Sequence, residues 1–173
     1  MKGMDRGNTT TKRRIALALM ELLDEKAFGE ITVTEITDRA GVSRMTYYRN
    51  YPSKEAILEE RVREISRELQ NIVVSLEDTY HSLVSGFHFV RDYSGALQIL
   101  LKADMGIMLL RVITDHIQAT IGEQSRGKYT IPMYAGALYN TYVAWLENGM
   151  KESPEEMARL IYEAFSFPEQ GET

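Results

Sequence analysis

The segment 32–51 constrains the fold of this chain most, because it combines two helix-start signals with a glycine turn. Thr32 and Glu35 stand three residues apart and form a capping box, which opens one short helix. Gly41 can adopt a positive φ at little steric cost and can therefore end that helix within one residue. Ser43 can then cap a second short helix. This order of signals predicts a helix-turn-helix, the layout of a motif that reads DNA.

The second helix of this motif carries polar side chains on one face if Tyr47 and Tyr51 pack inward. An arginine can read guanine through two hydrogen bonds, and hydroxyl groups suit phosphate oxygens, so the outward residue types match a major-groove surface. A solvated surface helix within another kind of helical protein is the alternative interpretation. The four residues expected to face outward are Arg44, Thr46, Tyr48 and Arg49.

The sequence GVSRMTYYRNYPSKEAIL, which begins at Gly41, resembles the signature of the TetR family of transcriptional regulators. The resemblance is specific over about residues 10–58, and beyond that only the general plan matches. It implies an all-α fold: a three-helix DNA-binding domain over 1–52, followed by a helical ligand-binding and dimerisation domain over 53–173. It also implies a homodimeric repressor that binds a palindromic double-stranded DNA operator.

Family contacts carry over to matching positions of this chain. The resemblance implies that Thr34 and Lys54 contact phosphates. It implies that Thr46 and Tyr48 contact the DNA backbone or the bases, and that Arg44 and Arg49 read the base sequence.

Three positions depart from the family pattern. Thr37 replaces a small alanine, so its hydroxyl must bond a carbonyl four residues back or the two helices must separate slightly. Met45 replaces a glycine and could either contact a thymine methyl or cover the flank of its own helix. Asn50 replaces a histidine but can still donate a hydrogen bond to a phosphate, so DNA binding should survive while base preference differs.

Apolar residues recur at helical spacing along the rest of the chain, and no window alternates as a strand would. A fourth helix from Ser53 should run for roughly 24 residues, about 36 Å, and transmit motion between the two domains. The other helices are expected at 10–26, 79–92, 95–102, 104–121, 132–150 and 154–166.

The last two predicted helices carry more apolar surface than one small bundle needs, and Gly136 and Gly149 permit close approach of backbones. We therefore expect these helices to pair with their symmetry mates in a four-helix dimer interface. An ordinary monomer core is the alternative. The predicted interface residues are Tyr139, Tyr142, Val143, Leu146, Met157, Leu160, Ile161 and Ala164.

The middle helices could enclose an apolar cavity for a small-molecule effector, whose binding would release the operator. A helical core is the plainer interpretation of the same side chains. A second domain that binds a partner protein, with no small-molecule effector, is the alternative function. The candidate effector residues are Phe87, Phe89, Tyr93, Met105, Met108, Leu109 and Tyr134.

Composition excludes other classes of function. The chain has no cysteine, and His81 and His88 stand about 10 Å apart along one helix, so neither a metal nor another cofactor is expected. Phosphate loops and hydrolase motifs are missing, so we expect no enzyme.

The net charge of the chain is −5, but residues 1–67 have a net charge of +2, so the amino-terminal part is the cationic one. With no apolar run of roughly 20 residues and no signal peptide, we expect a cytoplasmic protein without membrane contact.

Overall fold

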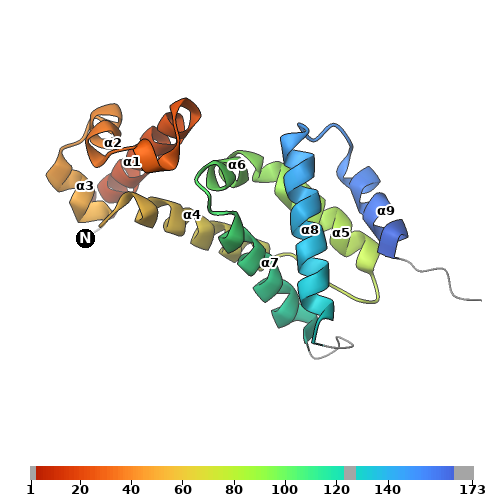
Figure 1. Ribbon diagram of the computed structural model, residues 1–173. Coiled ribbons are helices and arrows are strands. Elements are labelled where there is room, and N and C mark those ends of the chain that lie inside the picture. Colours follow the sequence, from red (N-terminus) through yellow and green to blue (C-terminus); the bar gives the residue numbers. More distant parts are fainter. Residues whose placement is uncertain (1–2, 123–127, 166–173) are drawn as a thin grey trace, which may run out of the picture. The chain divides into compact units, whose positions relative to one another are not determined.

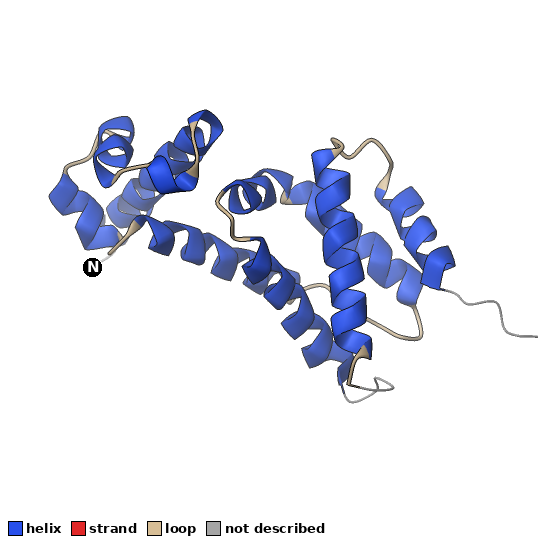
Figure 2. Ribbon diagram, viewed as in Figure 1, coloured by secondary structure: helices blue, strands red, loops and turns tan. Residues whose placement is uncertain are grey.

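The structure is a computed structural model that describes residues 3–122 and 128–165, and these residues form helices and loops with no strand (Figure 2). The predicted all-α fold is confirmed. No helix in the described part of the chain is long and apolar enough to cross a membrane. The elements are α1 (Gly3–Glu25), η1 (Phe28–Glu30), α2 (Val33–Ala40), α3 (Arg44–Asn50), α4 (Lys54–Leu69), α5 (Thr79–Asp92), α6 (Ser94–Lys102), α7 (Gly106–Ile121), α8 (Thr130–Glu147) and α9 (Pro154–Phe165).

Two helices differ from the prediction by more than three residues at one end. Helix α1 begins at Gly3, seven residues before the expected start. Helix α4 has 16 residues, about 24 Å, so the prediction of a 24-residue rod was wrong. After Leu69 the backbone tightens, because Ile72 N–H donates to the carbonyl of Leu69, three residues back, at 2.9 Å. The apolar spacing of the sequence continues past this point through Ile72 and Leu76, but Leu76 is 49% exposed, so the spacing marks no buried face there.

The chain divides into two compact units. The first comprises Met1–Glu64 and Gln98–Met105, and the second comprises Ile65–Leu97 and Gly106–Thr173. Helices α4 and α6 therefore each begin in one unit and end in the other. The expected domain boundary between residues 52 and 53 stays a prediction.

The core of the first unit forms where α1 packs against α2 and α3 (Figure 1). The apolar residues of α1 repeat at three- and four-residue spacing, so a single stripe of that helix is buried. Phe28, next to this core, is only half-buried, and the Lys54 ammonium lies 4.5 Å from the centre of its ring. The buried residues of α1 to α3 and the adjoining loops include Ile15, Leu19, Leu22, Leu23, Ile31, Ile36, Ala40 and Tyr47.

The second unit is built from two helix pairs, in which α5 packs with α9 and α7 packs with α8. The α7 and α8 pair buries a cluster of four residues, Ile117, Ile121, Ile131 and Ala135. On the α5 side, Phe87 is fully buried and meets the rings of Tyr142 and Trp145 edge-on at 4.8 and 5.3 Å. Helix α8 thus buries residues toward both α7 and α5.

Candidate nucleic-acid interface

The first helix of the predicted motif starts as its sequence requires. The Thr32 side chain accepts from Glu35 N–H, and the Glu35 carboxylate accepts from Thr32 N–H at 2.9 Å, which completes the capping box. The Lys26 ammonium also donates to Glu35. These hydrogen bonds, from Lys26 first and then from Thr32, lower the pKa of Glu35 to about 2.

The turn between α2 and α3 depends on Gly41, whose backbone is left-handed with φ 61° and ψ 43°. The Arg14 guanidinium reaches across from α1 and donates to the carbonyls of Ala40 at 2.6 Å and Gly41 at 3.1 Å. A Cβ atom at Gly41 would lie 2.8 Å from Arg14 Nη2. Ser43 then caps α3 by accepting from Thr46 N–H at 3.1 Å. Backbone geometry and a cation from α1 together fix where the second helix begins.

Thr37 is accommodated between the two helices. Its side chain is almost fully buried, and its hydroxyl donates to the carbonyl of Thr34 at 2.8 Å. The partner is three residues back in α2, one position nearer than the sequence suggested. A buried hydroxyl with a bonded partner carries little desolvation penalty.

Helix α3 is anchored by two tyrosines. Tyr47 is fully buried and Tyr51 is 5% exposed, as their spacing predicted. Burial raises the pKa of Tyr47 to about 12, so the phenol stays neutral. The opposite face is open: Met45 is 74% exposed and Tyr48 is 56% exposed. Arg44 and Arg49 are exposed as well, Thr46 is half-buried, and the first turn of α3 holds no acidic residue.

Several candidate DNA contacts already have partners within the chain. Arg44 Nη2 donates to the Thr34 hydroxyl, which joins two candidates on different helices. The Lys54 ammonium donates to the carbonyls of Phe28 at 2.6 Å and Ile31 at 2.7 Å. Asn50 donates from Nδ2 to Thr46 O at 2.8 Å. Lys54 must therefore exchange an internal bond for a phosphate, which lowers what it can add to binding. Asn50 keeps the second hydrogen of its amide for a phosphate.

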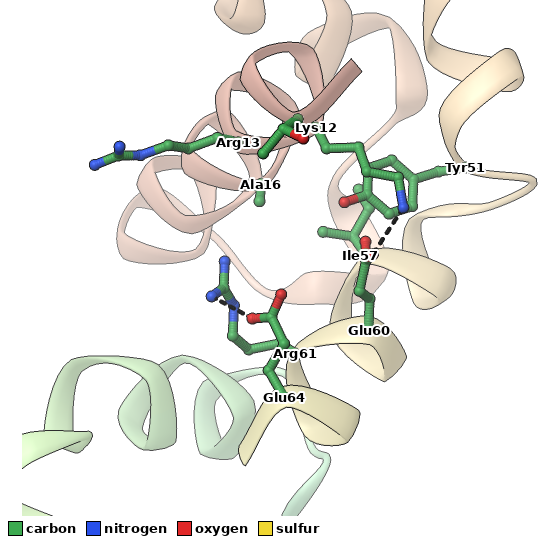
Figure 3. Close-up of a pocket in the computed structure, with 9 residues that line it drawn as sticks. Lys12, Arg13, Ala16, Tyr51, Ile57, Glu60, Arg61 and Glu64 are labelled. Atoms are coloured by element: carbon green, nitrogen blue, oxygen red, sulfur yellow. Dashed lines mark hydrogen bonds and ion pairs between the residues drawn. The ribbon is translucent and has the colours of Figure 1, made fainter. Parts of the chain in front are cut away.

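A groove between α1 and α4, with a volume of about 470 Å³, adjoins the end of α3 (Figure 3). Lys12 pairs with Glu60 at 2.7 Å, and Tyr51 also hydrogen-bonds Glu60. Burial raises the pKa of Glu60, but the hydrogen bonds from Lys12 and Tyr51 outweigh it, so the pKa is lowered. On the α4 side of the groove, Arg61 bonds Glu64, three residues further on, at 2.6 Å. No local sequence pattern points to the bond that crosses the groove, because Lys12 and Glu60 lie 48 residues apart.

The candidate effector residues belong to separate groupings. Phe87 packs on Tyr142 and Trp145, whereas Phe89 stacks on Tyr93 at 4.6 Å, and Tyr134 lies 5.0 Å from Phe165. Leu109 is buried and Met108 is half-buried in the second unit, and Met105 belongs to the first unit. Trp145, which sequence analysis did not single out, is 2% exposed with no partner for its indole N–H within the described residues.

The candidate dimer residues fall into two groups. Leu146 of α8 and Met157 and Ile161 of α9 are buried within a single protomer, and α9 packs against α5. The ring of Tyr142 already packs edge-on against the ring of Phe87 in the same protomer. The remaining four are open to a partner at least in part: Leu160 is 58% exposed, Ala164 is exposed, and Tyr139 and Val143 are half-buried.

Each of the three histidines has a hydrogen-bonding partner within the second unit. His81 Nδ1 lies 2.7 Å from Asp78, His88 Nε2 lies 2.9 Å from Glu155, and the His116 ring bonds the backbone of Ile72. Within residues 3–122 and 128–165, no cluster of three His, Cys, Asp or Glu side chains could hold a metal ion.

Solved structures share this fold. A TetR transcriptional regulator from Streptococcus agalactiae matches with a TM-score of 0.70 at 22% identity, over 93% of this chain and 96% of that chain. NalD, the secondary repressor of the MexAB-OprM multidrug efflux pump in Pseudomonas aeruginosa, matches with a TM-score of 0.61 at 17% identity, over 89% and 93%.

Curated relatives match over shorter stretches. EthR, an HTH-type transcriptional regulator of Mycolicibacterium smegmatis, is 46% identical over 44 residues, which are 25% of this chain and 20% of EthR. YvkB of Bacillus subtilis, an uncharacterized HTH-type regulator, is 33% identical over 75 residues, or 43% and 40%. The matched part thus spans only a fifth to two fifths of these relatives.

Two family models cover most of the chain. Residues 15–60 match the bacterial regulatory proteins of the tetR family, and residues 77–166 match the transcriptional regulator C-terminal region. The first match contains the capping box, the glycine turn and the exposed face of α3. The chain belongs to the TetR family of transcriptional regulators.

Proposed function

We propose that this regulator is a homodimeric repressor that binds a palindromic operator through α3 and is released by a small-molecule effector. The observation that carries the DNA-binding part is the open face of α3. Two guanidinium groups and a phenol project from a helix that Tyr47 and Tyr51 hold from behind. Such donors suit guanine edges and phosphates. The proposed contact residues are Thr34, Arg44, Met45, Thr46, Tyr48, Arg49, Asn50 and Lys54.

The DNA-binding proposal is tested with two variants of α3. Arg49→Ala should relax base preference and weaken binding by about 1 to 3 kcal/mol, because Arg49 is a sequence reader. Tyr48→Phe should weaken binding to all sequences alike, since it removes one hydroxyl contact to the backbone. Both are measured by mobility shift on an operator selected from random duplexes. If both variants bind it as the parent does, α3 is not the reading helix.

The dimer proposal rests on apolar side chains that one protomer leaves uncovered. Leu160 is 58% exposed on α9 and Met133 is 56% exposed on α8, and the half-buried Tyr139 and Val143 also belong to α8. Two reading helices must meet major grooves about 34 Å apart, which a symmetric dimer achieves. Leu160→Lys should convert the dimer to a monomer in light scattering. Val73→Lys, at an exposed position in the connector, the loop of residues 70–78 between α4 and α5, is the control. A parent protein that is monomeric at micromolar concentration would refute this proposal.

The effector proposal is supported by the aromatic groupings in the second unit and by the indole N–H of Trp145, which has no hydrogen-bond partner among residues 3–122 and 128–165. The alternative function, in which this unit binds a protein, draws support from the exposed Ile107 (61%) and Tyr129 (72%). Titration with 8-anilinonaphthalene-1-sulfonate, an apolar anionic dye, separates them. Saturable quenching of Trp145, the single tryptophan, together with weaker operator binding, supports an effector cavity. Dye binding that Ile107→Lys abolishes, without any change at Trp145, supports the protein-binding surface.

We further propose that the protein acts in the cytoplasm, where its operator is. No cofactor or catalytic residue is part of the proposal. The DNA-binding domain is proposed over residues 1–52 and the regulatory and dimerisation domain over 53–173.

A further inference from the structure

Met45 differs from the other exposed residues on the outer face of α3, because it is the apolar side chain that is most exposed to solvent there. Its side chain is 74% exposed, and Tyr48, one turn further on, is 56% exposed. The sequence left two roles for Met45, contact with a base or cover for the helix flank. A side chain that covered its own helix would be largely removed from water, and this one is not.

The surroundings of Met45 indicate which partner it meets. Arg44 and Arg49 are exposed on the same short helix, and the first turn of α3 carries no acidic residue. Arg44 donates to the Thr34 hydroxyl at the start of α2, while the Met45 side chain stays exposed to solvent. An apolar side chain between two cations fits an anionic surface that also presents an apolar group.

Duplex DNA has one such group in the major groove. Each thymine carries a C5-methyl there, while the other bases offer donors, acceptors or a bare ring edge. A methionine side chain is flexible and polarizable, so it can follow a methyl group closely. We propose that Met45 selects thymine in each half-site by contact with the C5-methyl group. This proposal rests on the proposed function, because it requires α3 to enter the major groove.

The magnitude follows from burying one methyl group. Removal of a methyl group from water contributes about 0.8 kcal/mol, which corresponds to about a fourfold change in affinity for each half-site. A symmetric operator with both thymines altered should therefore bind roughly 15-fold more weakly, on the same relation.

The test replaces each thymine of a selected operator, one at a time, by deoxyuridine, which lacks only the methyl group. Operators are first selected by the parent protein from random duplexes. Affinities are then measured by fluorescence anisotropy at one fixed salt concentration, because salt alone shifts them strongly. The parent should lose about fourfold at one thymine position in each half-site and little elsewhere.

Variants at position 45 assign that loss to the side chain. Met45→Gln keeps the length but adds a polar amide, and should bind the thymine and uracil operators equally. Met45→Leu should retain the discrimination, since it keeps an apolar end. Val73→Ala is the matched control, because Val73 is 75% exposed on the connector after α4, and it should discriminate as the parent does. Both substituted positions lie on the surface, so folding is not at risk.

The outcomes separate this proposal from the function on which it rests. If the parent selects no operator, the DNA-binding function fails and this proposal fails with it. If an operator is selected but every uracil is tolerated, the role of Met45 alone is refuted. Discrimination that persists in Met45→Gln would assign the methyl contact to another residue and would also overturn the proposal.

Discussion

The glycine turn of the reading motif offers the sharpest test of the structure. Gly41→Ala places a Cβ on a residue with φ 61°, and the left-handed region costs a non-glycine residue about 1 to 2 kcal/mol. The new Cβ would also lie 2.8 Å from Arg14 Nη2, so the guanidinium must shift, which weakens its bonds to the carbonyls of Ala40 and Gly41. Those bonds are partly open to solvent, so their weakening adds about 1 kcal/mol. The total destabilisation should be about 2 to 3 kcal/mol.

A double-mutant cycle separates the two contributions. In an Arg14→Met background the hydrogen bonds are already absent, so Gly41→Ala should cost only the backbone strain, about 1 kcal/mol less than in the parent. Gly29→Ala is the matched control, because Gly29 has no positive φ and a Cβ at that position would have no other atom within 4 Å.

Two readouts follow this cycle in the full chain. Urea unfolding followed by circular dichroism gives the change in stability, and amide hydrogen exchange in α2 and α3 localises it to the first unit. Trp145 fluorescence follows the second unit separately. If Gly41→Ala costs no more than Gly29→Ala, or if Arg14→Met leaves its cost unchanged, the described turn is wrong.

Four further substitutions test the local geometry. Asp104→Gly should raise the free energy of unfolding by about 0.5 to 1 kcal/mol in urea, because Asp104 has φ 58° at the end of α6; an unchanged midpoint would contradict this. Tyr47→Phe should stabilise by about 1 kcal/mol, since its buried hydroxyl has no partner within the described residues, whereas Tyr51→Phe should destabilise by about 1 kcal/mol through loss of the bond to Glu60. The opposite ranking in thermal melts would refute that assignment. The folded pKa of Glu35, about 2, lies below its usual 4.5, so its contribution is present above about pH 5 and lost as the pH falls toward 2. Glu35→Gln should flatten acid unfolding over that window, and an unaltered acid profile would exclude this role.

Local signals in the sequence predicted the reading motif well. The capping box of Thr32 and Glu35, the turn at Gly41 and the cap at Ser43 all involve residues three or four positions apart, and each is confirmed. Such interactions need no knowledge of the rest of the fold. The start of α9 at Pro154 was predicted for the same reason.

Long-range features could not be predicted in this way. Nothing near Arg14 in the sequence indicates that it caps α2, which ends 26 residues away, and nothing near Lys54 points to the carbonyls of η1. Helical periodicity past Leu69 also gave a wrong prediction, because the same apolar spacing continues into the loop after α4, where Leu76 is 49% exposed. Periodicity reports what could be buried, and only packing decides what is.

The first unit is built from two separate stretches of sequence, which limits how this regulator can be divided into fragments. Residues 98–105 supply the buried Leu100 and Ala103, and Lys102 pairs with Asp24 of α1. A fragment cut after residue 64 would lose all three. Grafting this amino-terminal half onto another regulator would likewise leave the new protein without that returning segment. Evolution or engineering that exchanges operator specificity must therefore change side chains in place, or carry the end of α6 along.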